Sequence, residues 1–221
     1  PGLLYWLIAG SYKVFGIHYL ATRLPFLIAG ALLILTTFAC TRILFRSTEA
    51  ALCAAAILAS NPTLFHLSVR STPDVILGLF MTVSFYGFLK ILFDGERRMR
   101  FYLIAYGAAG LAVSAKGMLG LFPPVFALGF GLWKRPGGLK ARDLVRWPAL
   151  VLGLALGSAW FLLVYGKHGA EFLRIFFNDQ VRLNSKIGFA FFSRDYIKRR
   201  TEKITFVIFC GFLRVSFRLK L

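Results

Sequence analysis

Acidic residues are scarce in this chain. Asp and Glu together number 9 against 27 Lys and Arg, and the four charged types make up only 16% of the 221 residues. Soluble domains carry about 25% charged residues, whereas 58% of this chain is hydrophobic and its mean hydropathy is +0.70. The shortage of charge therefore excludes an ordinary soluble domain. The formal charge of +18 leaves a choice between a nucleic-acid-binding face and the flanks of membrane helices.

Cysteine is also scarce, and its placement excludes two kinds of site. Cys40, Cys53 and Cys210 lie inside apolar runs, and none belongs to a CxxC or Cys/His spacing. Disulfide frameworks and zinc sites need such spacings, so we interpret the three residues as small buried hydrophobes. The HExxH, GxSxG and Walker patterns are missing as well, so the sequence indicates no metal, serine-hydrolase or P-loop site.

Long apolar runs are present instead. A run of about 17 to 25 apolar residues spans a bilayer as a helix, because no water is available there to satisfy its backbone groups. Six segments come close to that length, so we predict an all-α fold, a polytopic transmembrane helical bundle over residues 21–166. The predicted spans are residues 24–44, 50–69, 75–93, 101–115, 117–133 and 147–166.

Lys116 divides the fourth and fifth of these segments. One helix over both would be roughly 50 Å long, far more than the ~30 Å membrane core, so two helices with a tight turn fit better. Pro123 and Pro124 predict a kink or an irregular start in the second helix. Gly153 and Gly157 form a GxxxG pair that suits close packing of the last helix.

The Lys and Arg residues alternate between the loops. The loops after the first, third and fifth segments carry eleven of them, and the alternate loops carry two, Arg70 and Lys116. Because short cytoplasmic loops are enriched in Lys and Arg, we predict that turn 70–74, the turn at Lys116 and the residues after 166 face the extracytoplasmic side. Cations that flank apolar spans form no nucleic-acid-binding face, so we expect no nucleic-acid partner.

The two ends of the chain differ from its centre. Residues 1–20 are amphipathic and aromatic, and we predict an interfacial helix on the extracytoplasmic side. Residues 167–203 are polar and basic, as expected of an extracytoplasmic loop or helical segment. Residues 204–221 predict a truncated apolar and basic end, and the opening on Pro1 in the middle of an apolar pattern predicts that the natural protein continues upstream.

Three charged residues converge on the predicted extracytoplasmic side: Arg70, Asp74 and Lys116. A charge at membrane depth costs roughly 2.5 to 3.5 kcal/mol on insertion scales, so these residues need partners or a function. A purely structural reading stands beside the functional one. Asp74, or Thr72 followed by Pro73, would cap the next helix while Arg70 reaches to the interface.

His66 lies one turn before Arg70, close to the same predicted surface. A single histidine in an apolar run is more often a hydrogen-bonded interior residue than a ligand, so we regard it as a weak candidate for substrate binding. No residue pattern predicts a metal ligand set, and no cofactor follows from the residues themselves.

A series of short motifs resembles one enzyme family. PGLLYWLIA, KVFG and ATRLP in residues 1–25 are similar to the PPLYYWL, K-x-FG and AxRLP stretch of membrane glycosyltransferases of the family 39 type. RILF, ASNP, RSTPD, AKG and SAW then follow in the order of the family's RRLFG, ATSP, RxATPD, TKG and LPWY. The family includes protein O-mannosyltransferases, lipid A aminoarabinose transferases and rhizobial lipopolysaccharide core transferases. The resemblance covers roughly residues 1–182.

The resemblance implies a GT-C architecture with about six spans and interfacial helices. Such enzymes move a sugar from a polyprenyl-phosphate donor to a lipid, glycan or protein acceptor, here outside the bacterial inner membrane. Asp74 then positions the acceptor or a divalent metal ion, whereas the principal base is expected upstream of Pro1. Lys116, Arg70 and Arg182 would contact the lipid phosphate.

Residues 189–221 depart from the family pattern, because they lack its His/Pro/aromatic segment before a further span. The departure leaves open whether the fragment is active by itself. The alternative function is a fragment of a transporter or a lipid-carrier flippase, which is also a basic polytopic bundle. Transporters concentrate their polar residues near the middle of the helices, whereas here these residues gather at one membrane surface.

Overall fold

A computed structural model describes residues 2–134 and 141–175 of the chain. Residues Pro1–Leu163 form one compact unit and Val164–Leu221 a second, and the packing described below is that of the first unit. Every regular element in the described residues is helical, which confirms the all-α helical membrane bundle. The elements are α1 (Gly2–Phe15), α2 (Tyr19–Phe45), α3 (Thr48–Ala59), α4 (Pro62–Val69), α5 (Pro73–Phe93), α6 (Met99–Lys116), the 3-10 helix η1 (Met118–Leu121), α7 (Phe122–Lys134), α8 (Ala141–Leu144) and α9 (Trp147–Ile175).

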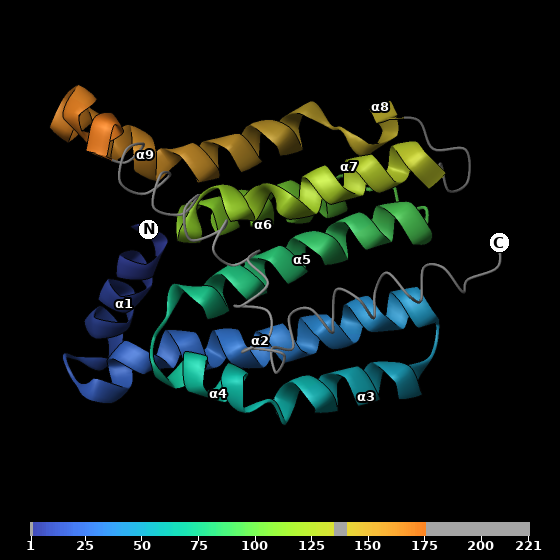
Figure 1. The fold of residues 1–221 in the computed structure, drawn as a ribbon, viewed down its shortest axis with the longest axis horizontal. Helices are drawn as coiled ribbons and strands as arrows, with labels where there is room; N and C mark the ends of the chain where they lie inside the picture. The colour runs from blue at the N-terminus through green and yellow to red at the C-terminus, as the bar shows by residue number, and fades with distance from the viewer. Residues whose placement is uncertain (1, 135–140, 176–221) are drawn as a thin grey trace, which may run out of the picture. The chain divides into compact units, whose positions relative to one another are not determined.

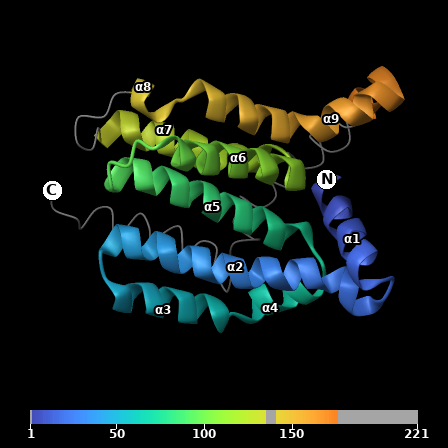
Figure 2. The same ribbon diagram turned by 180° about the vertical axis from the view of Figure 1, so that it is seen from behind.

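The long helices of the first unit run antiparallel. Figures 1 and 2 show α2 and α5 running in one direction, α6 and α9 returning in the other, and α1 lying across one end of the bundle. We call that end the α1 end, and it also holds turn 70–74 and the turn at Gly117. The opposite end holds the connections from α2 to α3 and from α5 to α6. We call it the basic end, because Arg42, Arg46 and Lys90 lie there.

Within the residues that the structure describes, three helices are long and apolar enough to cross a membrane: Tyr19–Phe45, Pro73–Phe93 and Trp147–Gly166. The pair Thr48–Ala59 and Pro62–Val69 passes the same test only as one bent span, which raises the number to four. Segment Met118–Lys134 is a shorter apolar helix. The count of six spans therefore stays a prediction. The irregular start expected near Pro123 takes the form of η1, which precedes α7.

The predicted segment 50–69 is bent by 56° between α3 and α4. Asn61 caps α4, since its side-chain Oδ1 accepts a hydrogen bond from the backbone N–H of Thr63 at 2.8 Å. Pro62 follows at the first helical position, where its missing N–H removes no helical hydrogen bond. The segment carries no Asp, Glu, Lys or Arg, and the break is marked only by short polar residues and a proline around Asn61.

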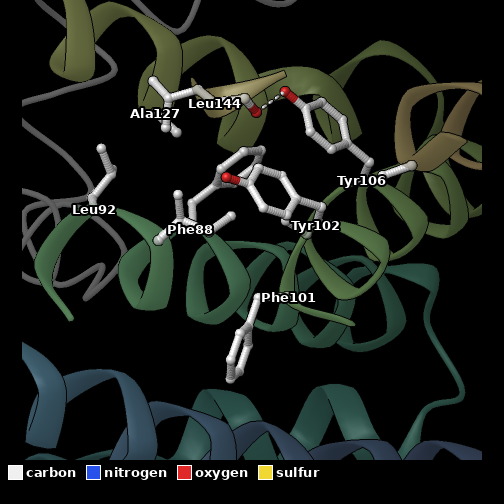
Figure 3. Close-up of a cluster of buried hydrophobic side chains, with 10 residues drawn as sticks. Phe88, Leu92, Phe101, Tyr102, Tyr106, Ala127 and Leu144 are labelled. Atoms are coloured by element: carbon white, nitrogen blue, oxygen red, sulfur yellow. Dashed lines mark hydrogen bonds between the residues drawn. The ribbon is translucent and has the colours of Figure 1, made fainter. Parts of the chain in front are cut away.

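The main hydrophobic core lies between α5, α6, α7 and α8 (Figure 3). Phe88 and Tyr102 are buried there, and Phe88 packs edge-on against Tyr106 with ring centroids 5.2 Å apart. The Tyr102 hydroxyl donates to the Asp143 carbonyl at 2.5 Å, and the Tyr106 hydroxyl donates to the Leu144 carbonyl at 3.0 Å. Each buried tyrosine hydroxyl thus has a hydrogen-bond acceptor in the backbone of α8.

Glycines bring α6 and α9 into close contact. A Cβ atom added at Gly110 would collide with the carbonyl of Gly153, and one at Gly153 would collide with the carbonyl of Tyr106. A Cβ atom added at Gly157 would lie 3.6 Å from the Gly110 Cα, which is an ordinary van der Waals distance. The Ser114 hydroxyl donates across the same interface to the Leu156 carbonyl at 2.5 Å. The GxxxG pair therefore packs against α6, as its sequence suggests.

The cysteine interpretation is right for one residue and wrong for another. Cys40 is buried, whereas Cys53 is exposed on α3. An apolar run did not indicate burial at Cys53, because the apolar side chains of a membrane helix can also face outward. Cys210 lies outside the described residues.

Gly110→Ala tests the packing of α6 against α9. The added methyl group has no room beside the Gly153 backbone, and such overpacking costs about 1 to 3 kcal/mol. We expect a lower midpoint of thermal unfolding for the purified protein in detergent micelles. Gly129→Ala is the control, because nothing lies within 4 Å of a Cβ atom there. Equal midpoints for the two variants would contradict the close approach.

Candidate active site

The turn between α4 and α5 has a defined backbone. The Arg70 N–H ends α4 by donating to the His66 carbonyl at 3.1 Å. Ser71 follows in the left-handed region with φ 56°, and Thr72 returns to extended backbone as the N-cap of α5. Pro73 then occupies the first helical turn, so Asp74 is a first-turn carboxylate of α5. Of the two capping residues that the sequence allows, Thr72 takes the N-cap position, although its side chain makes no capping hydrogen bond to α5.

Side chains from three elements hold this turn. The Ser71 hydroxyl donates to the Thr22 carbonyl at 3.4 Å, which joins the turn to the start of α2. The Thr22 hydroxyl shares a hydrogen bond of 2.7 Å with the Tyr12 hydroxyl of α1. The Thr72 hydroxyl donates back to the Leu67 carbonyl of α4 at 3.2 Å. Hydrogen bonds thus join the turn before Asp74 to α2 and α4, and α2 is in turn joined to α1.

Asp74 and Lys116 form an ion pair between the Asp74 Oδ1 and the Lys116 Nζ atoms. Lys116 is the last residue of α6, and Gly117 ends that helix with φ 82°. A carboxylate at a helix N-terminus and an ammonium at a helix C-terminus each complement the helix dipole. Because α5 and α6 are antiparallel, both favourable positions fall at the same end. The structure thus brings together two of the residues that the sequence singled out.

The pair is accessible, and each partner can do chemistry that the other cannot. The two side chains are each 41% exposed. A carboxylate can accept a hydrogen bond or a proton from a hydroxyl group, and an ammonium can neutralise an anionic leaving group such as a phosphate. An exposed pair of this kind contributes only about 0 to 1 kcal/mol to stability. Stability alone therefore gives little reason for the two charges at this position.

The side chains of the other predicted site residues have no such partner in the described part of the chain. Arg70 and His66 are both exposed, and their side chains make no hydrogen bond or ion pair with the residues that the structure describes. His66 is therefore not the hydrogen-bonded interior histidine that the apolar run suggested. Arg182 lies outside the described residues.

Within residues 2–134 and 141–175, no group of three or more His, Cys, Asp and Glu side chains is placed to hold a metal ion. Asp74 is the carboxylate of the turn, and its neighbour is the Lys116 ammonium. A metal ion at Asp74 would need further ligands from elsewhere, and we derive no step through one.

Sequence reasoning missed several residues at the α1 end. His18 caps α2, since its Nδ1 accepts from the Ala21 N–H at 3.0 Å. The Arg23 guanidinium lies 3.6 Å from the centroid of the Tyr19 ring, which adds a cation that the count of loop charges left out. The position of His18, directly before a long apolar run, is where an N-cap is expected, but histidine is an uncommon capping residue. Contacts such as Tyr12 with Thr22 leave no local signal.

Curated relatives cover most of this chain. An uncharacterized protein from Aquifex aeolicus (strain VF5) is 27% identical over 185 residues, which are 82% of this chain and 36% of that protein. An undecaprenyl phosphate-alpha-4-amino-4-deoxy-L-arabinose arabinosyl transferase from Pseudomonas aeruginosa (strain UCBPP-PA14) is 29% identical over 178 residues, 78% of this chain and 32% of that protein. The chain thus spans about a third of the length of these relatives.

No solved structure matches the chain significantly. A family model described as dolichyl-phosphate-mannose-protein mannosyltransferase matches residues 1–162. The match includes α1, turn 70–74, Lys116 and the Gly153–Gly157 packing, so the Asp74–Lys116 pair and the helices around it lie within it. The chain belongs to the dolichyl-phosphate-mannose-protein mannosyltransferase family.

Proposed function

We propose that this chain is part of an integral membrane glycosyltransferase that takes its sugar from a polyprenyl-phosphate donor. The observation that carries the proposal is the Asp74–Lys116 pair, an accessible carboxylate and ammonium at one end of an apolar bundle. The names of the family and of the Pseudomonas relative differ in the sugar, mannose in one and an aminoarabinose in the other. They share a polyprenyl phosphate carrier, so the carrier is the part of the substrate that we propose here.

Breaking the bond between the sugar and the carrier phosphate leaves negative charge on the phosphate. A cation held at that position lowers the barrier by stabilising the developing charge. Lys116 is our first candidate for this role, because its ammonium is at a fixed helix end and is 41% exposed. Arg70 and Arg182 are the further candidates, and Arg70 lies on the turn that carries Asp74.

Asp74 would orient the acceptor hydroxyl or a metal ion, and the principal base would come from a part of the protein before Pro1. Substrate binding would exchange the partner of Asp74. When a donor phosphate binds the Lys116 ammonium, it competes with the Asp74 carboxylate for the same cation. Asp74 is then free to accept a hydrogen bond from the acceptor, which is a hydroxyl group of a lipid, glycan or protein.

The loop charges support one orientation of the bundle in the membrane. The basic end carries Arg42, Arg46, Arg97, Arg98 and Arg100 among its cations, whereas the α1 end carries the fewer cations Lys13, Arg23, Arg70 and Lys116. Since short cytoplasmic loops are enriched in Lys and Arg, we propose that the basic end is cytoplasmic. The Asp74–Lys116 pair would then face the extracytoplasmic side of a bacterial inner membrane.

Substitutions at the pair test the proposed chemistry in the full-length protein. We expect Lys116→Ala to lower sugar transfer about 10² to 10³-fold, as loss of a charge-stabilising donor does. We expect Asp74→Asn to lower it about 10²-fold, at the low end for an acid–base group. The measurement is polyprenyl-phosphate release from a polyprenyl-phosphate sugar in membranes.

Two controls separate chemistry from folding. Arg97→Ala removes an exposed ion pair of 3.6 Å with Asp143 at the basic end, and we expect an unchanged rate. The double change Asp74→Lys with Lys116→Asp restores an ion pair with its signs reversed. We expect it to remain inactive, and recovery of the wild-type rate would assign the pair a structural role only. Full activity in both single variants would overturn the site.

Single-cysteine labelling tests the orientation. Met118 is 75% exposed at the α1 end, and Arg98 is exposed at the basic end. In a variant without native cysteines, we expect Met118→Cys to react with a membrane-impermeant maleimide on intact cells. Arg98→Cys should react only after the cells are permeabilised. The reverse pattern would place the proposed site on the cytoplasmic side.

A further inference from the structure

A pocket of about 430 Å³ lies between α2 and α5 at the basic end, away from the Asp74–Lys116 pair. Its polar lining comes from the last turns of the two helices, and its apolar lining includes the Phe38 and Tyr86 rings. Nothing in the proposed transfer reaction uses this pocket. The polar lining residues are Arg42, Arg46, Lys90 and Asp94.

The polar lining carries three cations and one carboxylate. Asp94 accepts from Arg46 at 2.9 Å and from Lys90 at 2.8 Å, so one carboxylate serves two cations. Arg46 also donates to the Phe93 carbonyl at 3.2 Å. Arg42 is exposed and has no ion pair with any residue that the structure describes. The pocket therefore has an excess of two positive charges and suits an anion.

Part of this charge has a structural explanation. Lys90 and Arg42 lie in the last turns of α5 and α2, where cations complement the helix dipole, and Arg46 covers a terminal carbonyl of α5. That explanation accounts for Arg46 and Lys90, which have partners. The helix dipole favours a cation at Arg42 as well, but it does not explain a third cation in the lining of one cavity that holds a single carboxylate.

One face of α2 leads into the pocket. Leu32, Leu35, Ala39, Arg42 and Arg46 recur at spacings of three and four residues, so they form one stripe along the helix. Leu32 and Leu35 are 45% and 63% exposed, as expected of side chains in contact with lipid. The stripe is thus apolar along the bundle and cationic at its end, which matches a molecule with an acyl chain and an anionic headgroup.

We propose that the pocket binds the phosphate of an anionic phospholipid whose acyl chain lies along the Leu32–Leu35 face of α2. Basic pockets between transmembrane helices recognise such headgroups on the cytoplasmic side, and arginine is well suited to phosphate because its guanidinium can donate two parallel hydrogen bonds. The apolar stripe favours a lipid over free phosphate, because free phosphate has no acyl chain to contact it. The inference rests on the helical bundle and not on the proposed transfer activity.

Lipid titration of the full-length protein in detergent tests the inference. Short-chain phosphatidylglycerol and phosphatidylcholine are added, and the bound lipid is counted by native mass spectrometry. We expect the phosphatidylglycerol to bind more tightly. A cation near a lipid surface contributes about 1 kcal/mol, so Arg42→Gln should weaken this binding about fivefold. Arg100→Gln is the control, since Arg100 is an exposed arginine at the same end that does not line the pocket.

Three results would each overturn the proposal. Equal binding of the two lipids would show that the headgroup charge is not recognised. Displacement of phosphatidylglycerol by inorganic phosphate at equal concentration would show a site for a free anion. An unchanged affinity in Arg42→Gln, with a thermal midpoint equal to that of Arg100→Gln, would place the lipid elsewhere on the protein.

Discussion

The membrane interior supplies no hydrogen-bond partners, and the rest of the structure depends on this constraint. Each backbone group in the long apolar segments has to be satisfied within a helix. Polar side chains follow the same rule: Ser84 donates to the Ala105 carbonyl at 2.7 Å, and no buried side-chain polar atom in the described residues lacks a partner. Charged groups are then confined to the helix ends. Chemistry on this scaffold is possible only where those ends meet.

The fold class and the sidedness of the charges could be predicted from the sequence because both arise from local composition. An apolar run has one viable structure in lipid, and Lys and Arg in the connections report the ends of the runs. Antiparallel succession then places every second connection at the same end. That reasoning put Asp74 and Lys116 on one side, and the structure pairs them. The pair forms because the N-terminus of α5 and the C-terminus of α6 lie at the same end of the bundle, which no motif indicates.

The features that sequence reasoning missed depend on contacts between distant residues or on single backbone positions. Nothing near Tyr12 or Thr22 indicates that they will share a hydrogen bond, and a serine gives no sign that it will adopt φ 56°. The bend at Asn61 was hidden because apolar composition continues on both sides of it. The pocket at the basic end was hidden for another reason: Arg42, Arg46 and Lys90 were read only as markers of orientation, which says nothing of where their side chains point.

The bend between α3 and α4 determines where turn 70–74 can lie. Helix α4 has 8 residues, which at about 1.5 Å each make a lever roughly 12 Å long. Turning a lever of that length by 56° moves its far end by about 11 Å. A straight continuation of α3 would therefore carry Arg70 and the start of α5 about one helix diameter away. Asp74 reaches Lys116 because two residues at the start of α4, Asn61 and Pro62, redirect the chain.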